Sequence, residues 1–184
     1  MAVYAGNAKK GEIEITKEQA VYENDFAVIY DDYVKFPKGD GRYLRTEWKA
    51  PYGVIIFPKN AQGGILLIRN FRHENRSWTW EVPKGFGEIG LSSLQCAKKE
   101  LEEETGFVGD DWHKFKTLKN STFETHIYNV TVDFPKEQST PEVGESISEV
   151  RFFSKEEFQS LIFNDEVSDP ITLFLLSYSL MIDE

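Results

Sequence analysis

Cysteine and histidine are scarce in this chain. Cys96 is its single cysteine, and His73, His113 and His126 are its three histidines. An intramolecular disulfide needs two cysteines, and zinc fingers and knuckles take cysteine and histidine ligands at close, regular spacings. The three histidines have no mutual spacing suited to a metal. The sequence therefore excludes a disulfide framework, and we expect neither a thiol redox pair nor a structural zinc site.

Long apolar segments are absent as well. No uninterrupted apolar run approaches the ~20 residues with which a helix spans a bilayer. The N-terminal sequence MAVYAGNAKKGEIEITKEQ lacks the apolar stretch of a secretory signal peptide. We therefore expect a soluble, cytoplasmic protein with no membrane partner.

Basic residues are outnumbered by acidic ones. The chain has 21 Lys and Arg against 31 Asp and Glu, which gives a formal net charge of −10 at pH 7. This charge repels the phosphate backbone of nucleic acids, so we expect no nucleic-acid polymer as a partner. A small phosphorylated ligand would need a local group of basic side chains or a bound cation.

Apolar residues, by contrast, are sufficient for a folded core. Hydrophobic residues make up 40% and aromatic residues 14% of the 184 residues, a length typical of one domain rather than two. Near the N-terminus, the segments FAVIYDDYVKF and RYLRTEW flank the turn-rich residues 37–41, and this pattern predicts a β-hairpin. We expect residues 1–50 to form an antiparallel β extension of the main domain at residues 51–184.

Periodicity and turn residues place the remaining elements. Short apolar runs bounded by proline and glycine predict strands, and capping residues before helix-forming segments predict helices. The strands are expected at residues 52–57, 65–71, 78–82, 115–119, 122–132 and 147–153, and the helices at 92–105, 154–163 and 169–181. Because strands lie before and after one central helix, the predicted fold class is mixed α/β.

The central helix is predicted to have an apolar and an acidic face. At about 100° per residue, Leu94 and Leu101 fall in one arc, which we expect to pack on the core. Glu100, Glu103 and Glu104 fall in a neighbouring arc, which we expect at the edge of the domain, facing a cleft. Hard divalent cations such as Mg²⁺ bind to oxygen clusters of this kind. The alternative is that the acidic run is only a solvated helix face.

The segment around this helix resembles a known signature. Gly85 is followed after five residues by Leu91, and after seven more by KELEEETGF at residues 99–107. This is similar to the Nudix box of the Nudix hydrolase superfamily, G-x5-E-x7-R-E-U-x-E-E-x-G-U, in which U is a bulky aliphatic or aromatic residue. Seven of the nine fixed positions match, and Leu91 and Lys99 replace the glutamate and the arginine. Lysine keeps the charge but loses the bidentate fork of arginine.

Other segments resemble the ADP-ribose pyrophosphatase-like branch of that superfamily. LLIRNFR at residues 66–72 is similar to a strand that ends in Q-Y/F-R, and WEVPKG at residues 80–85 is similar to an E-L/F-P-A-G lead into the box. GESISEV at residues 144–150 is similar to a G-E-x-I-E-V loop and strand. The resemblance implies a Nudix-type α/β/α sandwich with a mixed sheet and an N-terminal antiparallel β extension.

The resemblance also implies a divalent metal site on the helix. Glu100 and Glu104 would ligate Mg²⁺, or Mn²⁺ in its place, and Glu103 would support the cluster as a further ligand. The backbone carbonyl of Lys84 would supply another oxygen. Such a cation polarises a phosphoryl group and lowers the pKa of a bound water.

The implied reaction is Mg²⁺-dependent hydrolysis of the pyrophosphate bond in a nucleoside diphosphate linked to another moiety, with ADP-ribose or a nucleotide sugar favoured. Glu103 and Glu145 are the catalytic candidates, and Glu142 is the alternative to Glu145. Arg72 would bind the diphosphate. Trp48 would stack on a base, and a homodimer is expected, because in the resembling branch the N-terminal region often crosses to the partner subunit.

Two other interpretations remain open at this point. GFGEIG at residues 85–90 is a literal G-x-G-x-x-G, but a dinucleotide-binding fold needs a buried parallel strand after the helix with an acidic residue about 20 positions on. Here Glu103 and Glu104 still belong to the helix, and the following WHKFKTLK is polar. The second alternative is a catalytically silent Nudix fold that senses a ligand or binds a partner, which the departures at Leu91 and Lys99 motivate.

Overall fold

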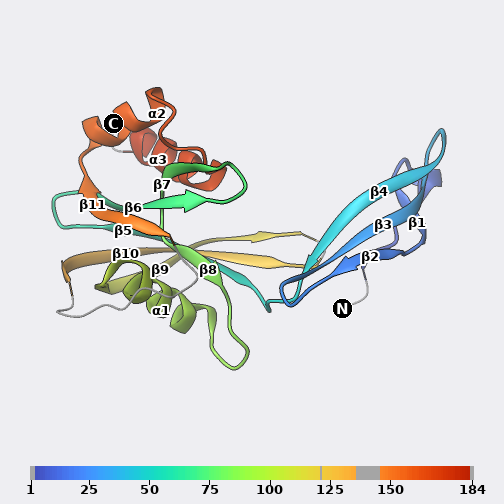
Figure 1. The fold of residues 1–184 in the computed structure, drawn as a ribbon, viewed down its shortest axis with the longest axis horizontal. Helices are drawn as coiled ribbons and strands as arrows, with labels where there is room; N and C mark the ends of the chain where they lie inside the picture. Colours follow the sequence, from blue (N-terminus) through green and yellow to red (C-terminus); the bar gives the residue numbers. More distant parts are fainter. Residues whose placement is uncertain (1–2, 121, 136–145, 183–184) are drawn as a thin grey trace.

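The computed structural model describes residues 3–120, 122–135 and 146–182. The strands of these residues form a four-stranded sheet from the N-terminal part of the chain and a seven-stranded sheet from the rest. The four-stranded sheet extends to one side of the body that is built on the seven-stranded sheet (Figure 1). The predicted N-terminal β extension is therefore a sheet of its own.

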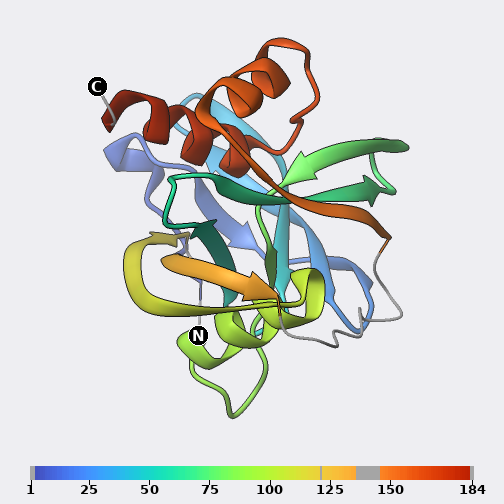
Figure 2. The same cartoon turned by 90° about the vertical axis from the view of Figure 1, so that its left-hand side faces the viewer.

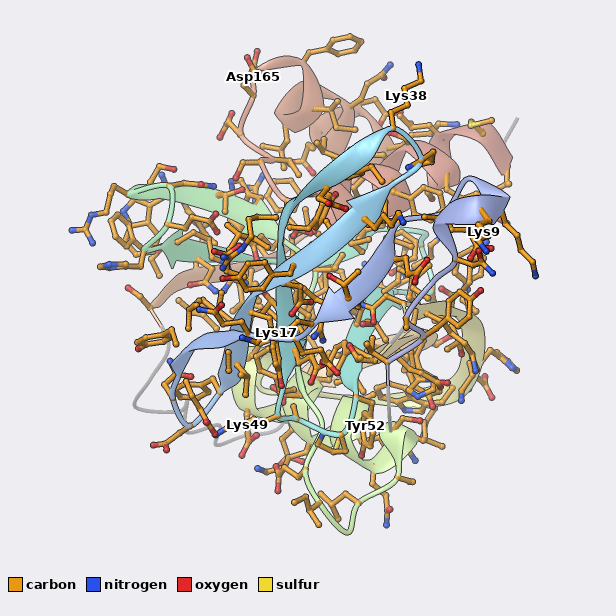
Figure 3. The ribbon with its side chains drawn as sticks, turned by 90° about the vertical axis from the view of Figure 1, so that its right-hand side faces the viewer. Lys9, Lys17, Lys38, Lys49, Tyr52 and Asp165 are labelled. Carbon is orange, nitrogen blue, oxygen red and sulfur yellow. The ribbon has the colours of Figure 1, made fainter. Side chains whose placement is uncertain are left out.

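The N-terminal sheet is antiparallel and largely exposed. Its strands are β1 (Glu14–Lys17), β2 (Ala20–Glu23), β3 (Ala27–Phe36) and β4 (Gly39–Trp48), preceded by a short 3-10 helix at Ala8–Lys10. The central strand β3 pairs with the other three. Figure 3 looks at this end of the molecule, with Lys17 labelled on β1 and Lys38 at the turn between β3 and β4. All four residues of β2 are exposed, so the sheet has little core of its own.

The hairpin in this sheet is tighter than the sequence predicts. The prediction places a turn at residues 37–41, but Phe36 pairs with Gly39, so Pro37 and Lys38 alone connect the two strands. Gly41 belongs to β4 and lies under the Phe36 ring, where an added Cβ would be 2.7 Å from a ring carbon. Here glycine allows a close approach inside the strand, which a sequence pattern cannot distinguish from a turn.

The seven-stranded sheet is mixed. Its main path has the order β11-β6-β5-β10-β9, with β7 paired to β6 and β8 paired to β5. Strands β5 and β10 are parallel, and the other pairs are antiparallel. The strands are β5 (Gly53–Lys59), β6 (Ile65–Arg72), β7 (Ser77–Glu81), β8 (Lys84–Phe86), β9 (Phe107–Lys119), β10 (Glu124–Pro135) and β11 (Ile147–Phe153).

Helices cover both faces of this sheet. They are α1 (Ser93–Thr105) on one face, and α2 (Lys155–Phe163) and α3 (Pro170–Ile182) on the other (Figures 1 and 2). Alternate residues of β5 serve the two cores: Val54 and Ile56 pack with α1, whereas Ile55 and Phe57 pack with α2 and α3. This is the period-two pattern of a strand that is buried on both faces. The predicted α/β/α sandwich with a mixed sheet is confirmed.

Capping residues set the helix boundaries close to the predicted positions. Ser92 and Gln95 form a reciprocal capping box at the start of α1, and Ser154 and Glu157 form another before α2. Gly106 ends α1 in the left-handed conformation, with φ 76°. None of the helices in the described residues is long and apolar enough to cross a membrane.

Some strands depart from the sequence prediction. The short strands β1, β2 and β8 are not predicted, and β9 begins directly after α1 rather than at residue 115. The pairing of β9 with β10 is irregular at three places, and Asp111 has a positive φ of 51°. Such irregularities interrupt the alternation of apolar and polar residues by which a strand is recognised.

The packing of α1 on the sheet gives a test of the fold. Leu101 is fully buried in the core between α1 and the sheet, so Leu101→Ala should lower the free energy of unfolding by ~2–5 kcal/mol. Ile89 is 93% exposed, and Ile89→Ala should stay within ~0.5 kcal/mol of the parent. Urea unfolding followed by circular dichroism measures both, and equal effects of the two changes would contradict the described packing.

Candidate active site

An open cleft of about 820 Å³ lies beside β8, between α1 and the first residues of β5 and β10. A volume of this size accommodates a ligand as large as a nucleotide derivative. Charged groups line one part of the cleft and aromatic rings another. The charged side chains are Arg72, Lys84, Glu88, Lys99 and Glu100, and the aromatic ones are Phe26, Phe86 and Phe123.

The three predicted glutamates of α1 have different surroundings. Glu100 lines the cleft and lies so close to Gly85 that a Cβ added there would overlap its carboxylate. Glu104 is buried, and its Oε2 accepts a 2.9 Å hydrogen bond from the Lys84 backbone N–H. Glu103 lies 3.4 Å from the ammonium of Lys99. Strand β8 therefore crosses directly over the acidic face of α1.

The acidic face offers donors for a cation without enclosing one. Among the described residues, no three Asp, Glu, His or Cys side chains are grouped so that they could hold a metal ion. Mg²⁺ needs no such cage, because it commonly binds one or two carboxylates and completes its shell with water and substrate phosphates. Glu100 and Glu104 are one helical turn apart and both contact β8, so they fit this donor set.

Arg72 and Lys84 form a wall of cations in the cleft and belong to a network of ion pairs. The guanidinium of Arg72 binds both carboxylate oxygens of Glu81, which is 1% exposed. Lys84 Nζ lies 3.0 Å from Glu81 Oε2 and 2.5 Å from Asp169 Oδ1. The hydrogen bonds to Glu81 raise the pKa of Arg72, although its burial opposes this. Two cations and two carboxylates thus meet where β6, β7, β8 and the start of α3 come together.

The pKa of Asp169 is lowered within this network. Burial alone would raise it, but the charge of Lys84 and the hydrogen bonds from Lys84 and Thr172 outweigh the burial. Asp169 is therefore a carboxylate near neutral pH and keeps its ion pair with Lys84.

The two departures from the Nudix box have structural consequences. Lys99 pairs with Glu88 at 2.6 Å, and this hydrogen bond is the main reason that the pKa of Lys99 is raised. Leu91 packs against the apolar core between α1 and the sheet, and its carbonyl accepts a hydrogen bond from the Tyr52 hydroxyl at 2.6 Å. Leu91 thus has a packing role at the position where the pattern has a carboxylate.

The aromatic part of the cleft includes residues that the sequence did not single out. Phe86, 43% exposed, contacts Phe123 at 6.1 Å and Trp48 at 5.1 Å between ring centroids. Trp48, the predicted base-stacking residue, is therefore in ring contact with Phe86, which itself lines the cleft. Phe26 brings the N-terminal extension to the same cleft.

Two predicted site residues lie outside the described part of the chain, and the structure adds two site residues that were not predicted. Glu145 and its alternative Glu142 lie outside the described residues. Glu81 and Asp169 were missed as members of the site. Glu81 carried a signal, because it stands between Trp80 and Val82 in an apolar run, where a charged residue is seldom buried without a partner. No comparable signal marks Asp169 as a member of the site, because its partner Lys84 is 85 residues away in the chain.

A family profile described as "NUDIX domain" matches residues 49–173, more than half of the chain. The chain belongs to the Nudix family. The α1 carboxylates, β8 and the segment at residues 85–107 that resembles the Nudix box all lie within the matched range.

Two relatives and one solved structure extend this Nudix assignment. The ADP-ribose pyrophosphatase of Bacillus subtilis (strain 168) is 27% identical over 170 residues, which are 89% of this chain and 90% of that protein. The mRNA-decapping protein g5R of African swine fever virus is 27% identical over 146 residues, 67% of this chain and 58% of its own length. A solved structure described as an ADP compounds hydrolase has a TM-score of 0.69 and 18% identity, with 98% of this chain and 95% of the other chain covered. The last match shows the fold alone.

These findings confirm the resemblance to the ADP-ribose pyrophosphatase-like branch and identify the chain as a Nudix pyrophosphohydrolase. Nudix hydrolases generally use divalent metal ions, and the carboxylate oxygens of Glu100 and Glu104 are donors that such ions prefer. The strand that directly follows α1 is β9, which pairs antiparallel with β10, so the described residues do not form the dinucleotide-binding arrangement.

The contact between Gly85 and Glu100 in the Nudix box can be tested. In Gly85→Ala the new methyl group must displace the Glu100 carboxylate or β8, and a shift of ~1 Å can cost ~10²-fold in rate. Steady-state hydrolysis with a Mg²⁺ titration measures the loss. Gly64→Ala is the control, because the three atoms nearest to its methyl group belong to the Asn60 side chain at the turn between β5 and β6, and it should stay within about twofold of the parent. Equal turnover of the two variants would contradict the described contact.

Proposed function

We propose that the protein hydrolyses the pyrophosphate bond of a nucleoside diphosphate linked to another moiety in a Mg²⁺-dependent reaction, with ADP-ribose or a nucleotide sugar as substrate. The observation that carries the proposal is the division of the cleft into an acidic helix face, a wall of cations and an aromatic part. A compound with a flat base, a charged diphosphate and a sugar matches these three parts. The near full-length similarity to an ADP-ribose pyrophosphatase favours ADP-ribose.

In this proposal Glu100 and Glu104 hold the metal, with the Lys84 carbonyl as a further oxygen. Mn²⁺ could replace Mg²⁺ with the same donors. When bound, the cation neutralises phosphate charge and lowers the pKa of a coordinated water. The contact of β8 with both glutamates fixes the direction of their carboxylates before substrate arrives.

Position in the cleft supports the roles proposed for Arg72 and Phe86, and the resemblance of the sequence supports those proposed for Glu103 and Glu145. Arg72 lines the cleft and would bind the diphosphate through charge-assisted hydrogen bonds. Phe86, backed by Trp48, offers a ring face for a base. Glu103, held beside Lys99, and Glu145 are the candidates for supporting the metal cluster and for activating the water.

Capped RNA is a second candidate substrate, since one relative is an mRNA-decapping protein. The net charge of −10 disfavours a long polyanion, so a small compound is preferred. A catalytically silent Nudix fold that only binds a ligand or a partner would hydrolyse neither the small compound nor capped RNA.

The carboxylates of α1 give the central test of this function. Glu104→Gln should lower turnover by at least ~10²-fold while the fold persists, because it removes one preorganised charge from the site. Glu102→Gln is the matched control on the opposite side of α1 and should remain near the parent. The assay is a Mg²⁺-dependent hydrolysis panel of ADP-ribose, other nucleotide sugars, dinucleoside polyphosphates, NADH, nucleoside triphosphates and a cap analogue. An inactive parent would refute the function, and normal turnover of Glu104→Gln would refute the site.

We also propose that the N-terminal sheet joins two copies of the chain. Its exposed apolar residues include Tyr33 and Leu44, which lie on the same face and are 40% and 68% exposed, and a sheet with so little core of its own is seldom stable unless something covers a face. A second copy would cover it and would lie close to the cleft, because Phe26 lines the cleft.

This arrangement predicts a dimer that depends on the extension. Leu44→Glu should shift the protein toward the monomer, because a charge would have to be buried in the interface. Ile89→Glu, at an exposed position in the loop before α1, should leave the dimer intact. Size-exclusion chromatography with light scattering distinguishes the two, and a monomeric parent would refute the proposal.

A further inference from the structure

Glu81 is the most deeply buried charged residue beside the cleft. It is the last residue of β7, it is 1% exposed, and its neighbours in the chain, Trp80 and Val82, belong to the core under α2 and α3. A carboxylate in such a place is costly unless other groups compensate its charge. Its compensation comes from two side chains that both line the cleft, Arg72 and Lys84.

The contacts of Glu81 determine where these two cations lie. Arg72 Nε donates to Oε1 at 2.9 Å and to Oε2 at 3.0 Å, and its Nη2 also donates to Oε2. Lys84 Nζ is 3.0 Å from the same Oε2. One carboxylate oxygen therefore brings a guanidinium and an ammonium together, although their like charges would otherwise drive them apart.

The start of α3 holds Lys84 from the other side. Asp169 Oδ1 is 2.5 Å from Lys84 Nζ, while Oδ2 accepts hydrogen bonds from the backbone N–H and the hydroxyl of Thr172 at 2.8 and 2.7 Å. The Thr172 hydroxyl in turn accepts the backbone N–H of Val82 at 3.1 Å. The ammonium is thus fixed between two carboxylates, and these belong to elements that are tied to each other.

Both cations keep exposed surface while their positions are fixed. The side chains of Arg72 and Lys84 are 38% and 22% exposed, and both border the cleft. Binding a dianion to cations that are already in place avoids the entropy cost of ordering them. In addition, Lys84 stands where the E-L/F-P-A-G pattern has alanine, so this chain has an ammonium that the pattern does not require.

We propose that Glu81 is a positioning residue that holds Arg72 and Lys84 together as one binding site for the two phosphoryl groups of a diphosphate. Arg72 and Lys84 contact the ligand, and Glu81 acts through them. The proposal rests on the function proposed above, but the binding of the diphosphate group itself can be measured without any hydrolysis.

The experiment compares the full-length parent with Glu81→Gln, which keeps the shape of the side chain and removes its charge. Isothermal titration with inorganic pyrophosphate in the presence of EDTA measures binding that depends on the cations alone. We expect at least tenfold weaker pyrophosphate binding by Glu81→Gln. With the hydrolysed substrate, we expect KM to rise by a similar factor and kcat to change less than threefold, because prepositioned cations contribute mainly to ground-state binding.

Asp32→Asn is the matched control for the loss of a buried ion pair. Asp32 is also 1% exposed, and it binds Arg45 at 2.8 Å in the N-terminal sheet, away from the cleft residues. Both variants should lower the melting temperature, but only Glu81→Gln should weaken pyrophosphate binding and raise KM. A role limited to stability would change the melting temperature alone.

Three results overturn the proposal: a parent that binds no pyrophosphate without metal, a folded Glu81→Gln with the parent's affinity, or equal loss of affinity in Asp32→Asn. If Glu81→Gln does not fold, Asp169→Asn decides, because it releases Lys84 from the other side. A loss of at least threefold in its pyrophosphate affinity supports the proposal, and an unchanged affinity overturns it. A further outcome is that the parent hydrolyses nothing on the substrate panel while Glu81→Gln still binds pyrophosphate more weakly than the parent and Asp32→Asn do. In that case the proposed function fails and the anion-binding site stands.

Discussion

The close approach of β8 to the acidic face of α1 is the constraint on which this site depends. At Gly85 the strand leaves no room for a side chain beside the Glu100 carboxylate, and one residue earlier its backbone N–H holds Glu104. The strand is kept in that place by its ladder with β5, and the helix by Ala97 and Leu101 in the core. Two carboxylates with like charge are therefore oriented by packing rather than by each other.

Much of the fold could be predicted because its signals are local. Capping boxes and Gly106 fix the ends of the helices, and the two-sided burial of β5 and β6 produces continuous apolar runs. The strands that escaped prediction lack such signals. β8 is three residues long and is a strand only because β5 lies beside it, and β9 bends at Asp111, so its periodicity is broken.

The candidate site also has a part that could be predicted from the sequence and a part that could not. Glu100, Glu103 and Glu104 could be chosen from the sequence because their helical spacing places them in one arc, and Arg72 because LLIRNFR at residues 66–72 resembles a strand that ends in Q-Y/F-R. The partner of Arg72 and the aromatic lining of the cleft could not be predicted in this way. The Arg72 guanidinium is held by Glu81, and Phe86 rather than Trp48 lines the cleft. These pairings depend on how separate strands meet, which no short pattern records.

The ion pair between Lys84 and Asp169 links residues 85 positions apart, at the start of the Nudix box and at the start of the last helix. The cleft is therefore completed only when the C-terminal part of the chain has docked. During synthesis α1 and the strands around it would emerge first, and the cation wall would be assembled last. For the same reason, a chimaera that exchanges the box between relatives would need to exchange residues 168–172 with it, since a new residue at position 84 would leave the Asp169 carboxylate without its cation.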